Sequence, residues 1–214
     1  YNDCDFAAKI NCCDLPEISA VFVEPVLGVG GCQSAQPGFM KAIRKFCDDN
    51  DALMVVDEVQ TGIGRTGKFW AFEHSGVIPD IVCSAKALGG GYPLGAVITK
   101  DSLNHLPKGS HGSTFGGHPI SCAAALMVQA MINEEFLGKV EERGNFLRQG
   151  LQRALPNYPV DGLGMMLAAV LPNEYYQKRL MHDCFCDGLL LLPAAQNAIR
   201  LLLPLNSEEK LIEE

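Results

Sequence analysis

The sequence lacks several patterns that define common functional classes. Its 17 lysines and arginines are outnumbered by 25 aspartates and glutamates and are scattered in ones and twos, so no basic stripe for nucleic acid is present. No apolar run reaches the roughly eighteen residues that a membrane span needs, because Pro193 and Arg200 interrupt the longest one. These absences predict a soluble protein with neither nucleic acid nor membrane among its partners.

The nine cysteines have neither the C-x2-C spacing of a zinc site nor the density of a disulfide framework. Cys83 and Cys122 lie in apolar stretches and are expected to be small buried hydrophobic residues. We therefore predict no bound metal and a reducing, cytoplasmic location. Neither end reads as a signal peptide, and a start at Tyr1 rather than at methionine indicates a partial sequence.

The order of apolar and amphipathic stretches predicts an α/β fold. Four short apolar runs are expected to be strands, and their continuous hydrophobicity is typical of a largely parallel sheet covered on both faces. Apolar residues at helical spacing predict a helix over 37–50 and a helix-rich region over 119–155. The four expected strands are residues 20–25, 52–59, 80–85 and 94–99.

The C-terminal part of the sequence predicts a smaller α+β unit. We place the boundary near residue 135, which divides the chain into a large domain over 1–135 and a small domain over 136–214. The stretches that suggest this unit are the apolar segment at 162–171, a helix around 173–184, and strands at 188–193 and 198–204.

Two charged residues follow apolar strands directly. Asp57 ends the run LMVVD, and Lys86 follows DIVCSA. Ligands of parallel sheets bind beyond the carboxyl ends of the strands, so both side chains are expected to point into a crevice. A lysine there is partly desolvated, which lowers its pKa and makes its amine a usable nucleophile. The glycines at 89–91 would let the backbone turn tightly beside a ligand.

Taken separately, the two residues have simpler interpretations. Asp57 also suits a helix cap or a metal carboxylate, and Lys86 also suits an exposed loop. Together, an acid and an amine at neighbouring strand ends fit pyridoxal phosphate, which forms a Schiff base with a lysine and needs a carboxylate at its pyridine nitrogen. Asp57 would then set the strength of the cofactor's electron sink.

Four segments, in the same order and spacing, resemble the signature blocks of the class III aminotransferases, which are fold type I pyridoxal-phosphate enzymes. The segments are AVFVEPVLGVGG, VVDEVQTGIGRTGKF, PDIVCSAKALGGGYPLGAV and HGSTFGGHPISCAAAL. HGSTFGG and NAIRLLLPL are most similar to the members that act on N-acetylornithine and related N-acylornithines. The resemblance implies a cytoplasmic homodimer with shared active sites. It also implies a role in amino-acid metabolism, specifically in arginine biosynthesis.

The resemblance assigns the cofactor ring to four residues of this chain. Lys86 would be the Schiff-base lysine and the acid/base of the reaction, and Asp57 would be the partner of the pyridine nitrogen. Val59 would pack on the ring face, on the same side of an extended chain as Asp57. Gln60 would form a hydrogen bond with the ring hydroxyl.

Further matches concern the cofactor phosphate and the substrate. Thr114, with its neighbour Ser113, would contact the phosphate from the other subunit of a dimer; the alternative is a capping pair before the helix at 119. Arg200, an arginine among leucines, would hold a substrate carboxylate in a bidentate fork; the alternative is a structural ion pair. Many members have a glutamate that swings onto this arginine where this chain has Val29, so Arg200 would stay open to carboxylates in both half-reactions.

The reaction that the resemblance implies moves the ω-amino group of N-acetylornithine, or of a similar ω-amino acid, to 2-oxoglutarate. Enzymes of the same class acting on 4-aminobutyrate, ornithine or diamines are alternatives. The family's first half, with its phosphate loop, has no counterpart before Tyr1, so a non-catalytic fragment or pseudoenzyme subunit is a second hypothesis. A nucleotide-binding α/β module is a third, and the absence of G-x-G-x-x-G and Walker patterns speaks against it.

Overall fold

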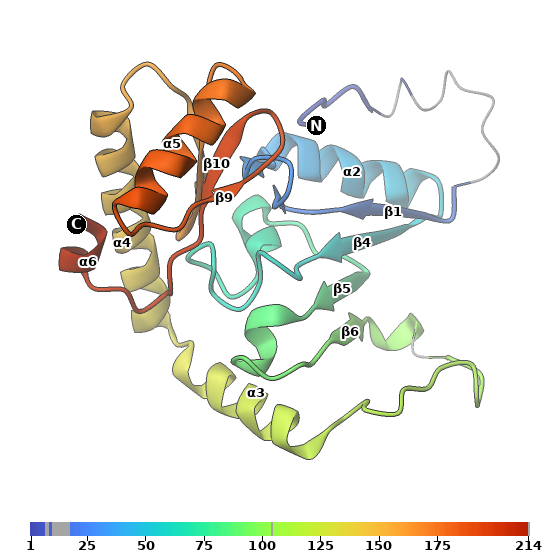
Figure 1. The fold of residues 1–214 in the computed structure, drawn as a ribbon. Coiled ribbons are helices and arrows are strands. Elements are labelled where there is room, and N and C mark those ends of the chain that lie inside the picture. Colours follow the sequence, from blue (N-terminus) through green and yellow to red (C-terminus); the bar gives the residue numbers. More distant parts are fainter. Residues whose placement is uncertain (7–8, 10–17, 104, 214) are drawn as a thin grey trace. The chain divides into compact units, whose positions relative to one another are not determined.

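The structure is a computed structural model that describes residues 1–6, 9, 18–103 and 105–213 (Figure 1). No single described helix is long and apolar enough to span a membrane; two helices, Pro119–Met131 and Glu134–Ala154, reach that length and composition only as a pair. The chain forms two units. Unit 1 comprises Tyr1–Pro25, Ala35–Ile63 and Trp70–Asn133, and unit 2 comprises Val26–Ser34, Gly64–Phe69 and Glu134–Glu214.

Unit 1 is built on a four-stranded sheet. Strand β1 pairs in parallel with β4, and β4 in parallel with β5, as the apolar runs predicted. Strand β6 runs antiparallel to β5, because residues 85–95 are too few for the crossover of roughly a dozen or more residues that a parallel neighbour needs. The strands, in spatial order, are β1 (Ala20–Val23), β4 (Leu53–Asp57), β5 (Ile81–Ser84) and β6 (Ala96–Thr99).

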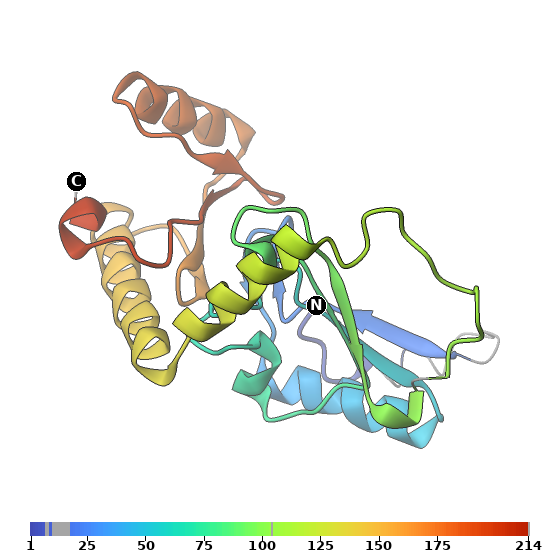
Figure 2. The same ribbon diagram turned by 90° about the horizontal axis from the view of Figure 1, so that it is seen from below.

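Helix α2 (Pro37–Asp49) covers one face of this sheet, as Figure 2 shows. Pro37 stands in the first turn, where its missing N–H has no helical partner to lose. The large side chains that α2 buries contribute roughly 1.5–3 kcal/mol each, and they hold in place the strand that ends at Asp57. This core includes Phe39, Met40, Ile43 and Phe46 of α2 with Val23, Met54 and Val56 of the strands.

The opposite face of the sheet is apolar and is open at its two outer strands, β1 and β6. Phe22 lies opposite Val55 on this face, and Val97 lies opposite Cys83. Phe22 is 73% exposed and Val97 is 69% exposed, so the described elements of unit 1 do not bury them. The expectation that these strands are covered on both faces is therefore wrong for the described residues. Phe22 and Val97 therefore contribute to an exposed apolar surface on this face.

A buried acid joins α2, β4 and the end of β6. The Asp80 carboxylate accepts hydrogen bonds from the Met54 amide at 2.8 Å, from Arg44 Nη1 at 2.7 Å and from Lys100 Nζ at 2.6 Å. Burial by itself would raise the pKa of Asp80, but these three donors outweigh it and lower the pKa to about 2. Asp80 thus fixes the start of β5 through charge-assisted bonds.

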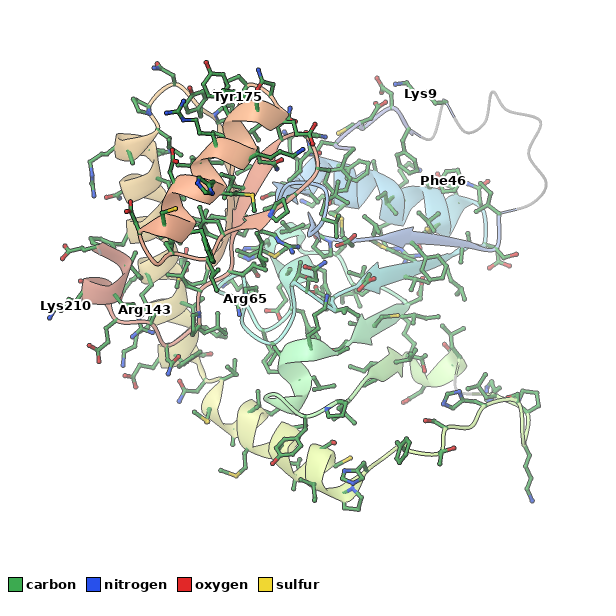
Figure 3. All side chains as sticks on the ribbon, viewed as in Figure 1. Lys9, Phe46, Arg65, Arg143, Tyr175 and Lys210 are labelled. Carbon is green, nitrogen blue, oxygen red and sulfur yellow. The ribbon has the colours of Figure 1, made fainter. Side chains whose placement is uncertain are left out.

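Unit 2 combines helices with antiparallel strands, which agrees with the expected α+β unit. Strand β8 is its centre, and Met166, Leu167 and Ala168 in it have no exposed surface. Helix α5 begins after Asn173, whose side chain accepts the amide of Tyr175 (labelled in Figure 3) at 3.1 Å. The helices are α4 (Glu134–Ala154), α5 (Glu174–Cys186) and α6 (Glu209–Glu213). The strands are β7 (Val160–Leu163), β8 (Met166–Val170), β10 (Ala198–Leu201) and β9 (Leu192–Pro193) in one sheet, and the hairpin β2 (Val26–Leu27) and β3 (Gln33–Ser34).

Two early segments, 26–34 and 64–69, belong to unit 2, which the sequence pattern did not indicate. Arg65, labelled in Figure 3, accounts for the second one. Its Nη1 donates to the Met165 carbonyl at 3.3 Å and to the Leu203 carbonyl, and its own carbonyl accepts the Met165 amide at 3.1 Å. Burial lowers the pKa of this guanidinium. The bonds link residues far apart in sequence, so no local period reports them.

Two expectations about individual residues are wrong. Cys83 and Cys122 are only half-buried, whereas Cys32 is buried and burial raises the pKa of its thiol to about 12. The apolar run 188–193 forms only the two-residue strand β9, because Gly188 (φ +89°) turns the chain out of α5 and the leucines that follow stay largely exposed.

Candidate active site

The carboxyl ends of two neighbouring parallel strands bring Asp57 and Lys86 to one edge of the unit 1 sheet. Asp57 is the last residue of β4 and lies opposite Cys83 of β5. β5 ends at Ser84, and Lys86 begins the short 3-10 helix η2 (Lys86–Gly89). Parallel neighbours are about 4.8 Å apart, so the acid and the amine leave the sheet at the same edge.

The backbone at Lys86 has a conformation that side-chain-bearing residues rarely adopt. Its φ is +47°, and the preceding Ala85 has φ −160° and ψ −149°. Such strained positions collect at functional sites, where the surrounding structure holds them. Gly90 at the end of η2 has φ +57°, and a Cβ there would lie 2.8 Å from the Val128 side chain of α3 (Pro119–Met131), so this turn favours glycine. Lys86 is exposed, so the described residues do not supply the desolvation expected for its amine.

The turn after β4 carries the other residues assigned to the cofactor ring. Asp57 is half-buried, and its Oδ1 accepts the Val59 amide at 2.9 Å, so the carboxylate bonds its own turn rather than capping a helix. Gln60 is half-buried in the same turn. Val59 lines a pocket of about 750 Å³ on the open face of the sheet, together with Cys83 and His111.

Glu58, which the sequence pattern gave no role, is the more buried of the two adjacent acids. It is 1% exposed. Its carboxylate accepts the Phe72 amide at 2.9 Å and the Thr61 hydroxyl. Burial raises the pKa of Glu58, and these hydrogen bonds oppose the rise only in part. The sequence did contain one sign that only one of the two acids faces the site. Side chains alternate along a strand, so neighbouring acids at a strand end must face opposite sides.

Ser113 and Thr114 lie in the segment 105–118, which is exposed throughout. Helix α3 begins at Pro119 with His118 as its N-cap and without a side-chain capping bond, so the capping alternative for Ser113 and Thr114 is wrong. Their contact with a cofactor phosphate from a second subunit stays a prediction.

Arg200 lies in unit 2, on β10 opposite Ala168. Its Nη1 donates to the Gly28 carbonyl at 3.0 Å, in the loop of the β2–β3 hairpin. The next residue, Val29, is 68% exposed, and its carbonyl accepts the Ala195 amide at 2.8 Å. Val29 therefore adjoins the residue that Arg200 contacts.

Comparison with known proteins identifies the family. A family profile described as Aminotransferase class-III matches residues 7–214. The chain belongs to the class III aminotransferase family. The acetylornithine aminotransferase of Caldanaerobacter subterraneus subsp. tengcongensis is 39% identical over 203 residues, which cover 92% of this chain and 51% of that protein. This class III aminotransferase chain thus spans about half the length of the curated relatives it matches.

Solved structures show the same class III aminotransferase fold. The N-acetylornithine aminotransferase of Stenotrophomonas maltophilia K279a is 32% identical, with a TM-score of 0.84 over 99% of this chain and 57% of that one. The ornithine delta-aminotransferase of Plasmodium falciparum is 30% identical, with a TM-score of 0.89 over 100% of this chain and 57% of that one. The fold class expected from the sequence is confirmed.

The residues at the strand ends fit pyridoxal phosphate. The cofactor needs a primary amine for its aldehyde and a carboxylate for its ring nitrogen, and the ends of β5 and β4 carry groups of these two kinds, the Lys86 amine and the Asp57 carboxylate. Val59 presents an apolar side chain at the wall of the adjoining pocket. The donor set at this edge therefore has the chemistry that the class III aminotransferases require.

Proposed function

We propose that this chain is part of a pyridoxal-phosphate enzyme that transfers the terminal amino group of N-acetylornithine, or of a similar ω-amino acid, to 2-oxoglutarate. The observation that carries the proposal is the pairing of Lys86 and Asp57 at the ends of adjacent parallel strands within a class III aminotransferase fold. The names of the relatives support the donor: they are acetylornithine aminotransferases, with ornithine aminotransferases among the similar structures.

The bound cofactor would supply an electron sink for the pair released when a Cα–H or Cω–H bond of the substrate breaks. Lys86 would hold the cofactor's aldehyde carbon and then move the proton with its amine. Asp57 would keep the ring nitrogen protonated, and its bond to the Val59 amide orients the carboxylate for that task. Val59 would pack on the ring face and Gln60 would bind the ring hydroxyl.

Arg200 would grip the carboxylate of each substrate. Its guanidinium can form two parallel hydrogen bonds with a carboxylate, which a point charge cannot. The Gly28 carbonyl fixes one end of the side chain. Because Val29 carries no charge, nothing at that position competes with the substrate for Arg200.

The working enzyme would be a cytoplasmic homodimer in arginine biosynthesis, with a large cofactor domain over 1–135 and a small domain over 136–214. Two features support the dimer. The segment with Ser113 and Thr114 is fully exposed, as a segment that reaches a partner's phosphate must be. Helix α3 contains no charged residue, yet most of its large apolar side chains are exposed: Ile120, Leu126, Met127 and Met131. A reducing compartment suits the described cysteines, which are free.

A non-catalytic role is the second candidate, and two observations favour it. The chain spans about half the length of its relatives, and the described residues of unit 1 do not cover the sheet face that carries Phe22 and Val97. A half-enzyme of this kind would keep the fold and the dimer surface but would acquire its cofactor cradle only with the complementary half.

Trapping the cofactor on the chain tests the proposal. The purified protein is incubated with pyridoxal phosphate, reduced with borohydride, digested and mapped by mass spectrometry. We expect the label on Lys86, and its loss in Lys86→Ala but not in Lys41→Ala, which removes an exposed lysine from α2. A label spread over several exposed lysines, or a folded chain without label, would favour the non-catalytic role. A panel of amino donors, applied to the complete enzyme, then separates N-acetylornithine from ornithine, 4-aminobutyrate and diamines.

A further inference from the structure

We propose that Glu58 is a positioning residue of this site: its buried carboxylate holds the turn that carries Asp57, Val59 and Gln60. The role of the turn in binding the cofactor rests on the proposed function. The hydrogen bonds by which Glu58 fixes the turn do not depend on it.

Glu58 and Asp57 are neighbours that face opposite sides of the sheet. Asp57 is half-buried beside Cys83, whose pKa is raised by burial and by the Asp57 charge. Glu58 faces the interior, and its amide donates to the Cys83 carbonyl at 2.8 Å, which extends the β4–β5 pairing by one residue. The chain therefore leaves the sheet immediately after Glu58, and whatever fixes Glu58 fixes the start of the turn.

The carboxylate of Glu58 is bound from both sides of the turn. One oxygen accepts the Thr61 hydroxyl, three residues ahead, and the other accepts the Phe72 amide at 2.9 Å. A further bond from the Ala71 amide contributes, so Glu58 ties the turn to the first residues of the 3-10 helix η1 (Ala71–Ser75). Its partners are a hydroxyl and main-chain amides, so the contacts fix geometry rather than neutralise charge.

The main chain closes the same turn. The Gly62 amide donates to the Glu58 carbonyl at 3.0 Å. A Cβ at Gly62 would lie 2.9 Å from that carbonyl oxygen and 2.9 Å from the Trp70 ring, so residues 58–62 are packed without spare space. Thr61 has no exposed surface. The bond between Glu58 and Thr61 and the Gly62–Glu58 main-chain bond thus close the same turn.

The fixed turn reaches Asp57 through one hydrogen bond. The Val59 amide donates to Asp57 Oδ1 at 2.9 Å, so a displacement of Val59 would release the carboxylate that the cofactor nitrogen needs. A buried acid is costly to keep, and an apolar residue of similar volume would satisfy a purely structural position at least as well. The carboxylate at 58 is explained by the orientation it imposes on residue 57.

Amide hydrogen exchange, resolved by residue on the 15N-labelled chain without cofactor, tests this role. In Glu58→Ala we expect the Val59 and Gly62 amides to exchange about tenfold faster or more, the ratio that corresponds to losing one hydrogen bond to a charged group. Glu58→Gln keeps one acceptor and a donor for Thr61, so these amides should stay within about threefold of the wild type. Asp80→Asn is the control, because it removes another buried carboxylate of unit 1 that does not contact the turn.

Two results would overturn the proposal. If Glu58→Ala speeds exchange only at the Ala71 and Phe72 amides, Glu58 merely caps η1. If Asp80→Asn speeds exchange at Val59 and Gly62 as much as Glu58→Ala does, the effect is a general loosening of unit 1. If Glu58→Ala does not fold, Thr61→Val serves instead, because it removes one donor and keeps the shape. It should speed exchange at Val59 and Gly62 and leave Phe72 unchanged; no change at Val59 and Gly62 would also refute the role. Because no cofactor is present, the answer is independent of whether Lys86 is labelled by pyridoxal phosphate.

Discussion

Replacing Asp80 with asparagine removes the acceptor that joins α2, β4 and the end of β6. The Asp80 side chain is 11% exposed and that of Arg44 is 17% exposed, so solvent screens this ion pair only weakly; Lys100 is 47% exposed, so its pair with Asp80 is screened more strongly. Its pKa falls from the ordinary 3.8 to about 2, which corresponds to roughly 2–3 kcal/mol of folding free energy at neutral pH. We expect Asp80→Asn to lower the free energy of unfolding at pH 7 by about that amount.

The pH dependence of this loss follows from the direction of the shift. The pKa of Asp80 is lower in the folded chain than in the unfolded chain, so its stabilisation is fully present above the unfolded value of 3.8 and is lost as the pH falls toward 2. The difference between wild type and Asp80→Asn should be constant from about pH 7 to pH 5 and should fall to roughly half by pH 3.

Urea unfolding followed by circular dichroism across this pH range measures the difference. The matched control is Asp48→Asn, because Asp48 also accepts a bond from Arg44, at 2.8 Å, but is 64% exposed. Exposed ion pairs contribute about 0–1 kcal/mol, so the control should change little. Equal losses in the two variants, or a loss in Asp80→Asn that does not depend on pH, would refute the assignment of this stability to the buried carboxylate.

Two further predictions concern unit 2. Gly144→Ala in α4 should lower the free energy of unfolding by roughly 3 kcal/mol or more, because the new Cβ would lie 2.3 Å from the Gly164 carbonyl oxygen. Gly150→Ala, in the same helix, should instead raise it by roughly 0.5–1 kcal/mol, because a Cβ there meets nothing within 4 Å. Thermal melts that move in the same direction for both glycines would contradict this packing. In the complete enzyme, Arg200→Lys should raise the KM for both carboxylate substrates about tenfold or more with a smaller change in kcat, because an ammonium cannot form the two-bond fork; steady-state kinetics with an unchanged KM would remove Arg200 from substrate binding.

Local pattern was sufficient for most of the fold. The period of apolar residues placed α2 within one residue of its observed end, and the short apolar runs marked β1, β4, β5 and β6. The acid and the amine that directly follow two of those runs, together with the family resemblance, were enough to predict Asp57 and Lys86 as site residues. These features are readable because they depend on residues close together in the chain, where spacing and side-chain type act directly on the backbone.

Several features were beyond that reach. The antiparallel direction of β6 depends on the path of residues 85–95, and the left-handed backbone of Lys86 depends on the turn around it. The assignment of segment 64–69 to unit 2 depends on hydrogen bonds from Arg65 to Met165 and Leu203, which lie 100 and 138 residues further along the chain.

The types of the reactive side chains and their places at strand ends could thus be predicted from local sequence. Their orientations could not. Residue order was enough to say that an amine and a carboxylate stand where apolar strands stop. Packing against η1 decides which of the two acids faces inward. Glu58 turns toward η1, and Asp57 stays on the outer side, where it accepts the Val59 amide of its own turn. Burial and long-range hydrogen bonds choose among arrangements that a sequence period leaves equally open, because their energies depend on neighbours that only the folded chain supplies.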